Sequence, residues 1–223
     1  MRDLELVIFD MAGTTIEDRG QVPDAFTAAL AEHGVNATRE QVKRVRGASK
    51  REALLRLIPA GPAHAQRAEA AYASFRVHLA RLYASEGVRA IPGATSAFHS
   101  LRERGVRVAL NTGFERETTA LLLSALGWGD GMVDAIVCGD DVRQGRPAPD
   151  LIFRAMEAVR VSNVQQVANI GDTTLDLEAG HNACVHWNIG VLSGAHDRQA
   201  LESAPHTHLI SSVAELPQLF ELK

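Results

Sequence analysis

The sequence predicts an α/β fold: a doubly wound, parallel-sheet (Rossmann-like) core with an all-helical cap domain inserted into it. Two observations predict this class. Residues 91–223 alternate between short apolar runs and amphipathic segments, the pattern of a parallel sheet with helices on both faces. A further apolar run near the N-terminus is separated from them by residues 17–90, which show only helical periodicity. Because a lone strand cannot bury itself, we expect one sheet and a core made of residues 1–16 and 91–223.

The elements follow from local patterns along the chain. A strand is expected at residues 4–9, an apolar run rich in strand formers that ends at a polar turn. In the cap, apolar spacing predicts helices over 23–33, over 39–57 with a break at Gly47, and over about 63–85. Beyond Ile91-Pro92-Gly93 we expect helices over 94–104, 115–126, 149–159 and 174–180, and strands over 106–111, 135–138, 167–170, 186–191 and 208–210.

Composition restricts the function classes. The net charge is −4, so the chain lacks the global positive charge that favours nucleic acid as a partner. No apolar run approaches the roughly 20 residues of a membrane span, and the N-terminus lacks a secretion-signal pattern. We therefore expect a cytoplasmic protein that acts on a small molecule, with no membrane partner and with its oligomeric state open, a homodimer included. Cys138 and Cys184 are expected to be buried thiols.

Polar residues follow four of the predicted strands, at the carboxyl ends where open parallel sheets bind ligands. They are Asp10, Thr112, Arg146 and Asp172. Two carboxylates at adjacent strand ends would repel each other unless a cation separated them, and carboxylate oxygens are ligands that suit Mg²⁺. The pattern therefore predicts Mg²⁺ as a cofactor.

The same sequence segments offer groups that bind phosphoryl oxygens. Backbone N–H groups at Gly13 and Thr14, a hydroxyl at Thr112 and a guanidinium at Arg146 are all suited to this task. A carboxylate beside them can act as a nucleophile. The residues thus indicate phosphoryl transfer from a small phosphate or phosphonate to an aspartate.

Four segments resemble, in order, the four motifs of the haloacid dehalogenase superfamily: Asp10-Met11-Ala12-Gly13-Thr14-Thr15, Asn111-Thr112-Gly113, Gly145-Arg146-Pro147-Ala148-Pro149-Asp150 and Gly171-Asp172-Thr173-Thr174-Leu175-Asp176. The resemblance implies Asp10 as nucleophile and metal ligand, with the Ala12 carbonyl and Asp172 as further metal ligands. It implies Asp176 as a supporting carboxylate. It also implies that substrate is bound at Ala12, Gly13, Thr14, Thr112, Gly113 and Arg146, with Thr112 and Arg146 also counted among the catalytic residues.

Ala12 departs from the usual pattern of the superfamily. Most of its phosphatases carry a second aspartate there, which protonates the leaving alcohol and later activates water. A positioned general acid or base is worth roughly 10² to 10⁴ in rate, or about 3 to 5 kcal/mol of activation free energy. We therefore expect an enzyme whose leaving group does not need that acid, unless another group supplies it.

The phosphonatases, which are phosphonoacetaldehyde hydrolases of this superfamily, resemble the chain at this position. They also have Ala there and Arg in the third motif, and their cap carries a Schiff-base lysine in a Gly-x-x-Lys element, which Gly47-Ala48-Ser49-Lys50 fits. The resemblance implies cleavage of a C–P bond through a phospho-Asp10 intermediate and a Lys50 imine. Nearby Lys43, Arg44, Arg46 and Arg51 are expected to lower the pKa of Lys50.

Other interpretations stay open at this point. The methionine and histidine that flank the phosphonatase lysine are replaced by Arg46 and Ala53, so the substrate can be a related phosphonate. The Gly47–Lys50 element also resembles the Gly-x-Ser-Arg cap element of sugar phosphomutases, which favours a phosphatase or phosphomutase acting on a small phosphate ester. A catalytically weakened binding protein with the same fold is a third alternative.

Overall fold

A six-stranded parallel sheet forms the centre of the computed structural model, which describes residues 4–129 and 131–220. The strand order is β3-β2-β1-β4-β5-β6, so the N-terminal strand lies between β2 and β4. The strands are β1 (Leu6–Asp10), β2 (Arg107–Asn111), β3 (Ala135–Val137), β4 (Val167–Gly171), β5 (Trp187–Val191) and β6 (His208–Ile210). The predicted fold class, with one sheet built from distant parts of the chain, is confirmed.

Helices cover both faces of this sheet, because the sheet is apolar on both sides. All five residues of β1 are buried, and successive side chains of a strand point to opposite faces. Val7 and Phe9 pack in one apolar cluster, and Leu6 and Ile8 in another. The flanking helices are α5 (Ala94–Arg102), α6 (Arg116–Leu126), α7 (Asp150–Val159), α8 (Thr174–Asn182), α9 (Arg198–Glu202) and α10 (Leu216–Leu219).

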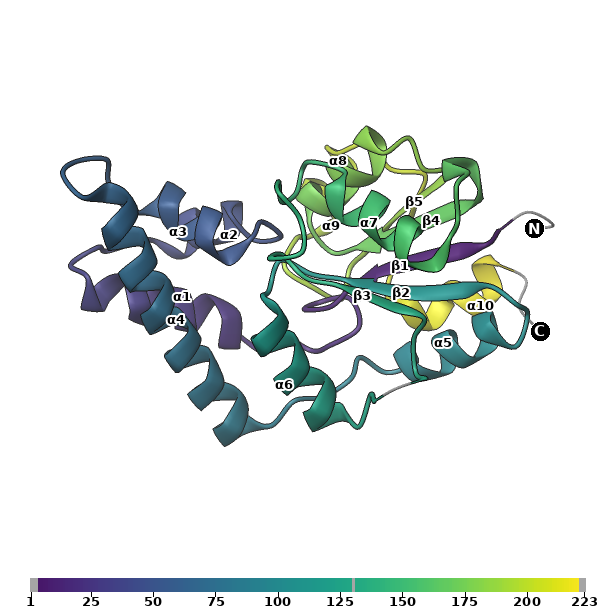
Figure 1. Cartoon of the computed structure of the whole chain (residues 1–223), viewed down its shortest axis with the longest axis horizontal. Coiled ribbons are helices and arrows are strands. Elements are labelled where there is room, and N and C mark those ends of the chain that lie inside the picture. Colours follow the sequence, from purple (N-terminus) through teal and green to yellow (C-terminus); the bar gives the residue numbers. More distant parts are fainter. Residues whose placement is uncertain (1–3, 130, 221–223) are drawn as a thin grey trace.

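Four helices between β1 and α5 form a separate layer, which we call the cap. They are α1 (Gln21–Glu32), α2 (Arg39–Arg44), α3 (Lys50–Leu57) and α4 (His64–Glu86). Figure 1 shows them beyond the ends at which the strands terminate. Within the cap, the rings of Phe26 on α1 and Phe75 on α4 lie 4.5 Å apart. The break predicted at Gly47 separates α2 from α3.

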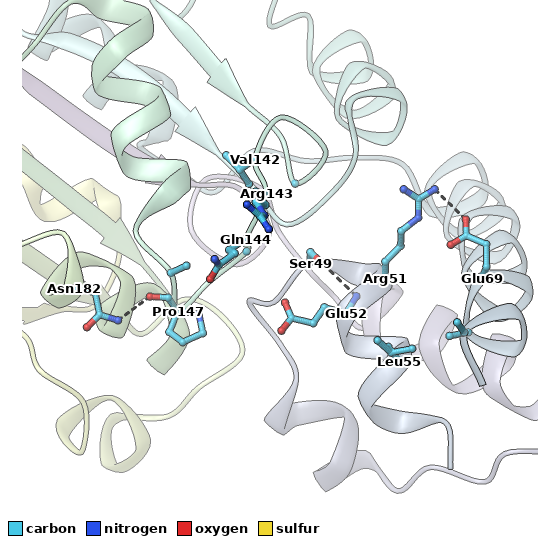
Figure 2. A pocket seen from close by; sticks show the side chains of 15 residues that line it. Ser49, Arg51, Glu52, Leu55, Glu69, Val142, Arg143, Gln144, Pro147 and Asn182 are labelled. Carbon is cyan, nitrogen blue, oxygen red and sulfur yellow. Dashed lines mark hydrogen bonds and ion pairs between the residues drawn. The ribbon is translucent and has the colours of Figure 1, made fainter. Parts of the chain in front are cut away.

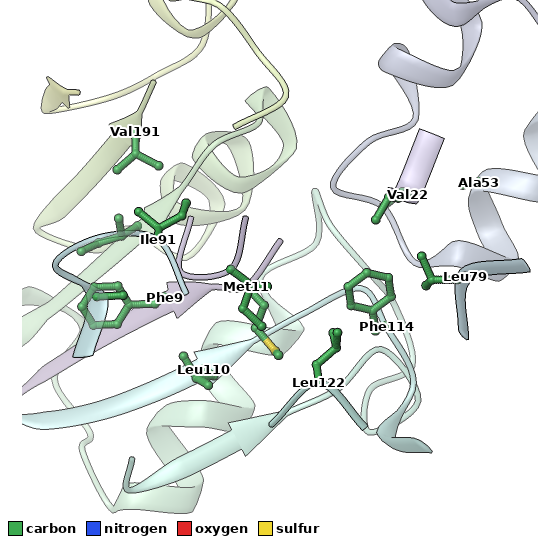
Figure 3. Packing of buried hydrophobic residues seen from close by; sticks show 14 of the residues in the cluster. Phe9, Met11, Val22, Ala53, Leu79, Ile91, Leu110, Phe114, Leu122 and Val191 are labelled. Atoms are coloured by element: carbon green, nitrogen blue, oxygen red, sulfur yellow. The ribbon is translucent and has the colours of Figure 1, made fainter. Parts of the chain in front are cut away.

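The apolar core continues from the sheet into the cap. Met11 and Phe114, which follow β1 and β2, belong to the same buried cluster as Val22 and Leu79 of the cap. Figure 3 shows these side chains between the two layers. This shared cluster fixes the cap over the carboxyl ends of the strands, where the polar motifs lie.

Some expectations need correction or stay open. Cys138 is a buried free thiol as expected, but Cys184 is exposed, because it lies in the turn after α8 at a φ of 57°. The sequence patterns also missed α9 and α10, which have five and four residues and are too short to show periodicity. The division into domains at residues 1–16 with 91–223 and 17–90 stays a prediction. Among the described residues, no helix is long and apolar enough to cross a membrane.

Phe98 on α5 provides a test of the core packing. It is fully buried, and its ring meets those of Phe9 at 5.1 Å and Trp128 at 5.2 Å. Phe98→Ala is expected to lower the free energy of unfolding by about 3 to 5 kcal/mol, measured by urea denaturation. The matched control is Phe153→Ala, at a side chain that is 45% exposed, which should change it by less than about 0.5 kcal/mol. Equal losses in the two variants would contradict this packing.

Candidate active site

Strand register brings the first and last motifs together. β1 and β4 are neighbours, with Phe9 opposite Ile170, so Asp10 and Asp172 emerge at adjacent strand ends. On the other side of β1, Asp10 lies opposite Asn111, the last residue of β2, and Thr112 follows directly. The carboxyl ends of three central strands therefore deliver their polar residues to one place, as the sequence predicted.

A small pocket of about 10 Å³ lies at this place, closed by the cap. Seven of the sequence-predicted site residues line it, together with Val22, Arg46, Gly47, Phe114 and Thr173. The seven are Asp10, Ala12, Lys50, Thr112, Gly113, Arg146 and Asp172.

The three remaining predicted residues contact the pocket residues. Thr14 donates a hydrogen bond from its hydroxyl to Asp172 Oδ1 at 3.2 Å. Gly13 lies so close to Asp172 that a Cβ at this glycine would clash with the carboxylate. Asp176 pairs with Arg146. The structure thus brings all of the predicted site residues together, and their chemical roles stay predictions.

Arg146 is the charged centre of the site. It is 2% exposed, and it makes ion pairs through Nη1 with Asp10 Oδ1 at 2.8 Å and through Nε with Asp176 Oδ1 at 2.9 Å. It also donates to the side chain of Asn111 and, at 3.3 Å, to the carbonyl of Gly47 in the cap. One guanidinium therefore orients the candidate nucleophile and joins it to the loop that carries Lys50.

Asp176 is held in place by the start of α8. Thr173 and Asp176 form a capping box, in which the N–H of Thr173 donates to Asp176 Oδ2 at 3.0 Å. The carboxylate is then saturated by this bond and by Arg146. This arrangement is compatible with the predicted supporting role of Asp176, whose carboxylate holds Arg146 through Nε.

Three buried carboxylates lie together in the site, and Arg146 makes ion pairs with two of them, Asp10 and Asp176. Burial raises the pKa of Asp10 to about 6 although Arg146 opposes the shift. Burial, together with the charges of Asp10 and Asp176, raises the pKa of Asp172 to about 7. The cluster of oxygen donors with surplus negative charge fits a hard divalent cation such as Mg²⁺.

Lys50 is a buried amine at the first position of α3. The residue is 7% exposed, and its Nζ donates to the Ala48 carbonyl at 3.3 Å and lies 4.7 Å from the centre of the Phe114 ring. Burial is the main cause that lowers the pKa of Lys50 to about 8, followed by the charge of Arg46. A pKa of about 8 leaves roughly a quarter of the amine neutral at pH 7.5.

This finding modifies the sequence-based explanation of the lysine. Neighbouring charges were expected to lower the pKa of Lys50, but desolvation by burial has the larger effect. Of the four basic neighbours named from the sequence, only Arg46 is among the main causes. Burial at the boundary between cap and core is therefore the main cause of the lowered pKa of Lys50.

Glycines allow the cap loop to approach the core closely. A Cβ at Gly113 would lie 2.5 Å from the carbonyl oxygen of Ala48, and the N–H of Lys50 donates to the Gly113 carbonyl at 3.3 Å. A Cβ at Gly47, whose φ is 90°, would clash with the Thr173 side chain. The loop before Lys50 therefore rests on the backbone of the core.

The sequence analysis placed several residues of the pocket lining outside the site. Val22, Phe114 and Thr173 line it, and so does Arg46, which was expected only to lower the pKa of Lys50. Arg46 was grouped with other basic residues of its helix, although its position directly before the break at Gly47 is a signal that could have separated it from them. Buried apolar residues such as Val22 give no such signal.

A larger cleft of about 660 Å³ lies beside the pocket, where the cap faces the core. Figure 2 shows Ser49, Arg51 and Glu52 of the cap on one side, and Arg143 and Gln144 of the core on the other. Ser49 and Gly145, the neighbours of the pocket residues Lys50 and Arg146, line this cleft too. It therefore lies next to the site along the boundary between cap and core.

Comparisons with known proteins agree with this arrangement. The family model of the haloacid dehalogenase-like hydrolases matches residues 4–183. The phosphonoacetaldehyde hydrolase of Bacteroides fragilis is 26% identical over 257 aligned residues that cover 100% of this chain and 97% of that protein.

Two solved structures have the same fold. A phosphonoacetaldehyde hydrolase-like protein from Oleispira antarctica has a TM-score of 0.86 at 24% identity, covering 98% of this chain and 92% of that one. A candidate β-phosphoglucomutase from Thermotoga maritima has a TM-score of 0.71 at 22% identity, covering 98% and 99%. At these identities the likeness concerns the fold alone.

The raised carboxylate pKa values predict how the stability of the metal-free protein depends on pH. Folded Asp10 and Asp172 have pKa values of about 6 and 7, above the ordinary value of 3.8, so the folded state binds more protons between these limits. Stability therefore falls as the pH rises from about 4 to 7. Thermal denaturation in EDTA should show this fall, and it should be smaller in Asp10→Asn.

Mg²⁺ is expected to oppose that loss of stability. Because a ligand that binds only the folded state stabilises it, millimolar Mg²⁺ should raise the melting temperature at pH 7.5 more than at pH 5. Asp10→Asn should lose most of this response, whereas Asp197→Asn, at an exposed residue paired with Lys43, should keep it. If Mg²⁺ left the wild-type melting temperature at pH 7.5 unchanged, the assignment of a Mg²⁺ site to these carboxylates would be contradicted.

Proposed function

The chain belongs to the haloacid dehalogenase-like hydrolases, and from this premise we propose that it cleaves the C–P bond of phosphonoacetaldehyde or a closely related phosphonate. The observation that carries the proposal is Lys50, a buried amine with a lowered pKa in the same pocket as Asp10. The likeness to a phosphonoacetaldehyde hydrolase over the whole chain supports the same class of substrate.

Mg²⁺ would be held by carboxylate oxygens of Asp10 and Asp172 and by the carbonyl of Ala12. When bound, it supplies positive charge that screens the phosphonyl oxygens from the two carboxylates. Thr112, Arg146 and the N–H group of Gly113 bind and orient those oxygens. The N–H groups of Gly13 and Thr14, which the sequence analysis assigned to this task, already donate to the carbonyls of Ile16 and Met11 at 2.7 and 3.2 Å. The two residues instead contact the candidate metal ligand Asp172, through the Thr14 hydroxyl and the backbone at Gly13.

Lys50 begins the reaction as a nucleophile. Its neutral amine adds to the carbonyl carbon of the substrate, and loss of water leaves a protonated imine. The imine withdraws electrons from the neighbouring carbon, which bears the phosphorus. The burial of Lys50 supports this role, since desolvation disfavours the charged ammonium form.

Asp10 then attacks phosphorus through a carboxylate oxygen. The O–P bond forms, the C–P bond breaks, and its electron pair moves into the carbon skeleton to give an enamine on Lys50. Protonation of the enamine carbon and addition of water release acetaldehyde and the free lysine. Water also hydrolyses phospho-Asp10 to phosphate and the original carboxylate.

This route explains why Ala12 can replace the usual aspartate. In a phosphate ester the leaving oxygen must be protonated, and a positioned acid supplies a factor of roughly 10² to 10⁴. In the proposed reaction the leaving group is carbon, and the imine takes up its electron pair. No acid is then needed at position 12 for the departure of the leaving group.

Borohydride trapping tests the imine. Reduction of the enzyme in the presence of phosphonoacetaldehyde should add the reduced substrate or product carbon skeleton to Lys50 and inactivate the enzyme irreversibly, as read by peptide mass spectrometry. Lys50→Arg should show neither modification nor turnover, whereas Lys43→Arg, at a half-exposed lysine of the same cap, should behave like the wild type. An unmodified Lys50 in an enzyme that still turns over this substrate would overturn the role.

A substrate panel separates C–P cleavage from the phosphate-ester alternatives. Because Ala12 removes the acid that ester cleavage needs, we expect kcat/KM for phosphonoacetaldehyde to exceed that for hexose phosphates and phosphoglycolate by about 10² or more. Phosphate release is the measurement. Comparable or faster release from a phosphate ester would favour a phosphatase or phosphomutase, and no release from any compound would favour a binding protein.

A further inference from the structure

The catalytic pocket contains a cation that the proposed reaction does not use. The Arg46 side chain is 10% exposed and lines the same pocket as Lys50 and Asp10. Its Nη2 pairs with Asp18 Oδ2 at 2.5 Å. Within residues 4–129 and 131–220, Asp18 is its one ion-pair partner, although a guanidinium has five N–H donors.

Asp18 holds this arginine in a fixed place. The Asp18 side chain is 3% exposed, and its Oδ1 accepts hydrogen bonds from the backbone N–H groups of Gly20 at 3.1 Å and Val22 at 3.2 Å. These bonds tie the carboxylate to the start of α1. Arg46 is therefore positioned by a group that is itself rigid, and its remaining donors are available to a ligand.

Arg46 and Lys50 come from opposite ends of one short loop. Gly47, Ala48 and Ser49 separate them, and the loop folds back so that both side chains line the pocket. The charge of Arg46 is also, after burial, the second cause of the lowered pKa of Lys50. Once the substrate is bonded to Lys50 Nζ, a group on the bonded carbon would therefore lie near the guanidinium of Arg46.

The surroundings of Arg46 are positively charged on its other side as well. A cavity of about 410 Å³ shares Arg46 with the catalytic pocket. The charged side chains lining it are Arg19, Arg39, Lys43, Arg46 and Asp24. Arg19, Lys43 and Arg46 are paired with Glu17, Asp197 and Asp18, which do not line the cavity. A lining rich in cations favours an anionic group, and the aldehyde end of phosphonoacetaldehyde offers none.

Building on the proposed function, we propose that Arg46 binds a carboxylate carried by the carbonyl carbon of the substrate, so that the preferred substrate is a phosphonate of a 2-oxo acid. A carboxylate and a guanidinium form paired, charge-assisted hydrogen bonds. On the imine, the carboxylate carbon is two bonds from Lys50 Nζ, within the pocket that Arg46 also lines.

The chemical steps remain balanced with this substrate. Lys50 adds to the ketone and water leaves; Asp10 forms the O–P bond as the C–P bond breaks, and the electron pair enters the enamine. Protonation at carbon and addition of water then release a 2-oxo acid, and water releases phosphate from Asp10. The carboxylate takes no part in bond changes, so Arg46 acts on specificity and positioning.

A matched pair of substrates tests the inference. Phosphonoacetaldehyde and 3-phosphonopyruvate differ only by the carboxylate on the carbonyl carbon. The wild type should prefer 3-phosphonopyruvate in kcat/KM by roughly 10-fold or more, and Arg46→Met should reduce this preference by roughly 10- to 100-fold, chiefly through KM. Arg46→Lys should restore part of it. Arg39→Met, at an exposed cation of the neighbouring cavity, should leave the ratio unchanged.

A binding measurement makes the result independent of turnover. With Mg²⁺ present, calorimetry should show that the wild type binds 3-phosphonopropionate more tightly than propylphosphonate, and that Arg46→Met loses this difference. Circular dichroism reports whether the variant is folded. An unchanged preference in a folded Arg46→Met would overturn the inference.

The outcomes separate this inference from the proposed function. If Arg46 acted only by lowering the pKa of Lys50, Arg46→Met would shift the pH profile and slow both substrates equally, and the carboxylate inference would be wrong. Wild-type turnover of phosphonoacetaldehyde without a preference for 3-phosphonopyruvate would overturn the inference and leave the proposed function standing. Turnover of neither phosphonate would overturn both.

Discussion

The site depends on one electrostatic constraint: the negative charge of the buried carboxylates at the ends of β1 and β4 has to be neutralised. Asp10 and Asp176 flank Arg146 at 2.8 and 2.9 Å, and Asp172 lies beside them without a cation of its own at such a distance among the described residues. In a region of low dielectric constant, this surplus of negative charge is costly. The folded chain therefore favours protonation or a divalent cation at this place, and only the cation also prepares the site for a phosphonyl dianion.

The cap completes the site through close backbone contact. Gly47 and Gly113 leave room for the cap loop to lie on the core, and Arg146 donates to the Gly47 carbonyl. This contact buries Lys50, and burial is the main cause of its lowered pKa. The lowered pKa of Lys50 therefore depends on the position of the cap. If the cap moved away, Lys50 would be exposed to water and its amine would return to its ordinary, protonated state.

Much of this arrangement follows from the sequence, and the rest does not, for physical reasons. Strands buried on both faces read as apolar runs, so the sheet and the polar residues at its carboxyl ends were predictable. Contacts between side chains that are distant in sequence leave no local pattern, so the pairing of Arg146 with Asp10 was not predictable. Arg46 shows the same limit: in sequence it belongs to a run of basic residues that resembles a solvated helix face, but it lies in the turn after α2, and only the tertiary fold buries it beside Asp18.

Core and cap then divide the chemistry between them. In the proposed mechanism the core would act on phosphorus in the same way whatever the leaving group is, because its groups would contact only the phosphonyl oxygens and the metal. With Ala12 in place of an acid, the groups that would stabilise the leaving group must come from the cap. The cap meets the pocket mainly through one loop, and that loop carries both an amine that can form an electron-withdrawing imine and a cation that can bind an acid. On this proposal, substrate choice is concentrated in the segment from Arg46 to Lys50, which is separate in the fold from the candidate nucleophile Asp10 at the end of β1.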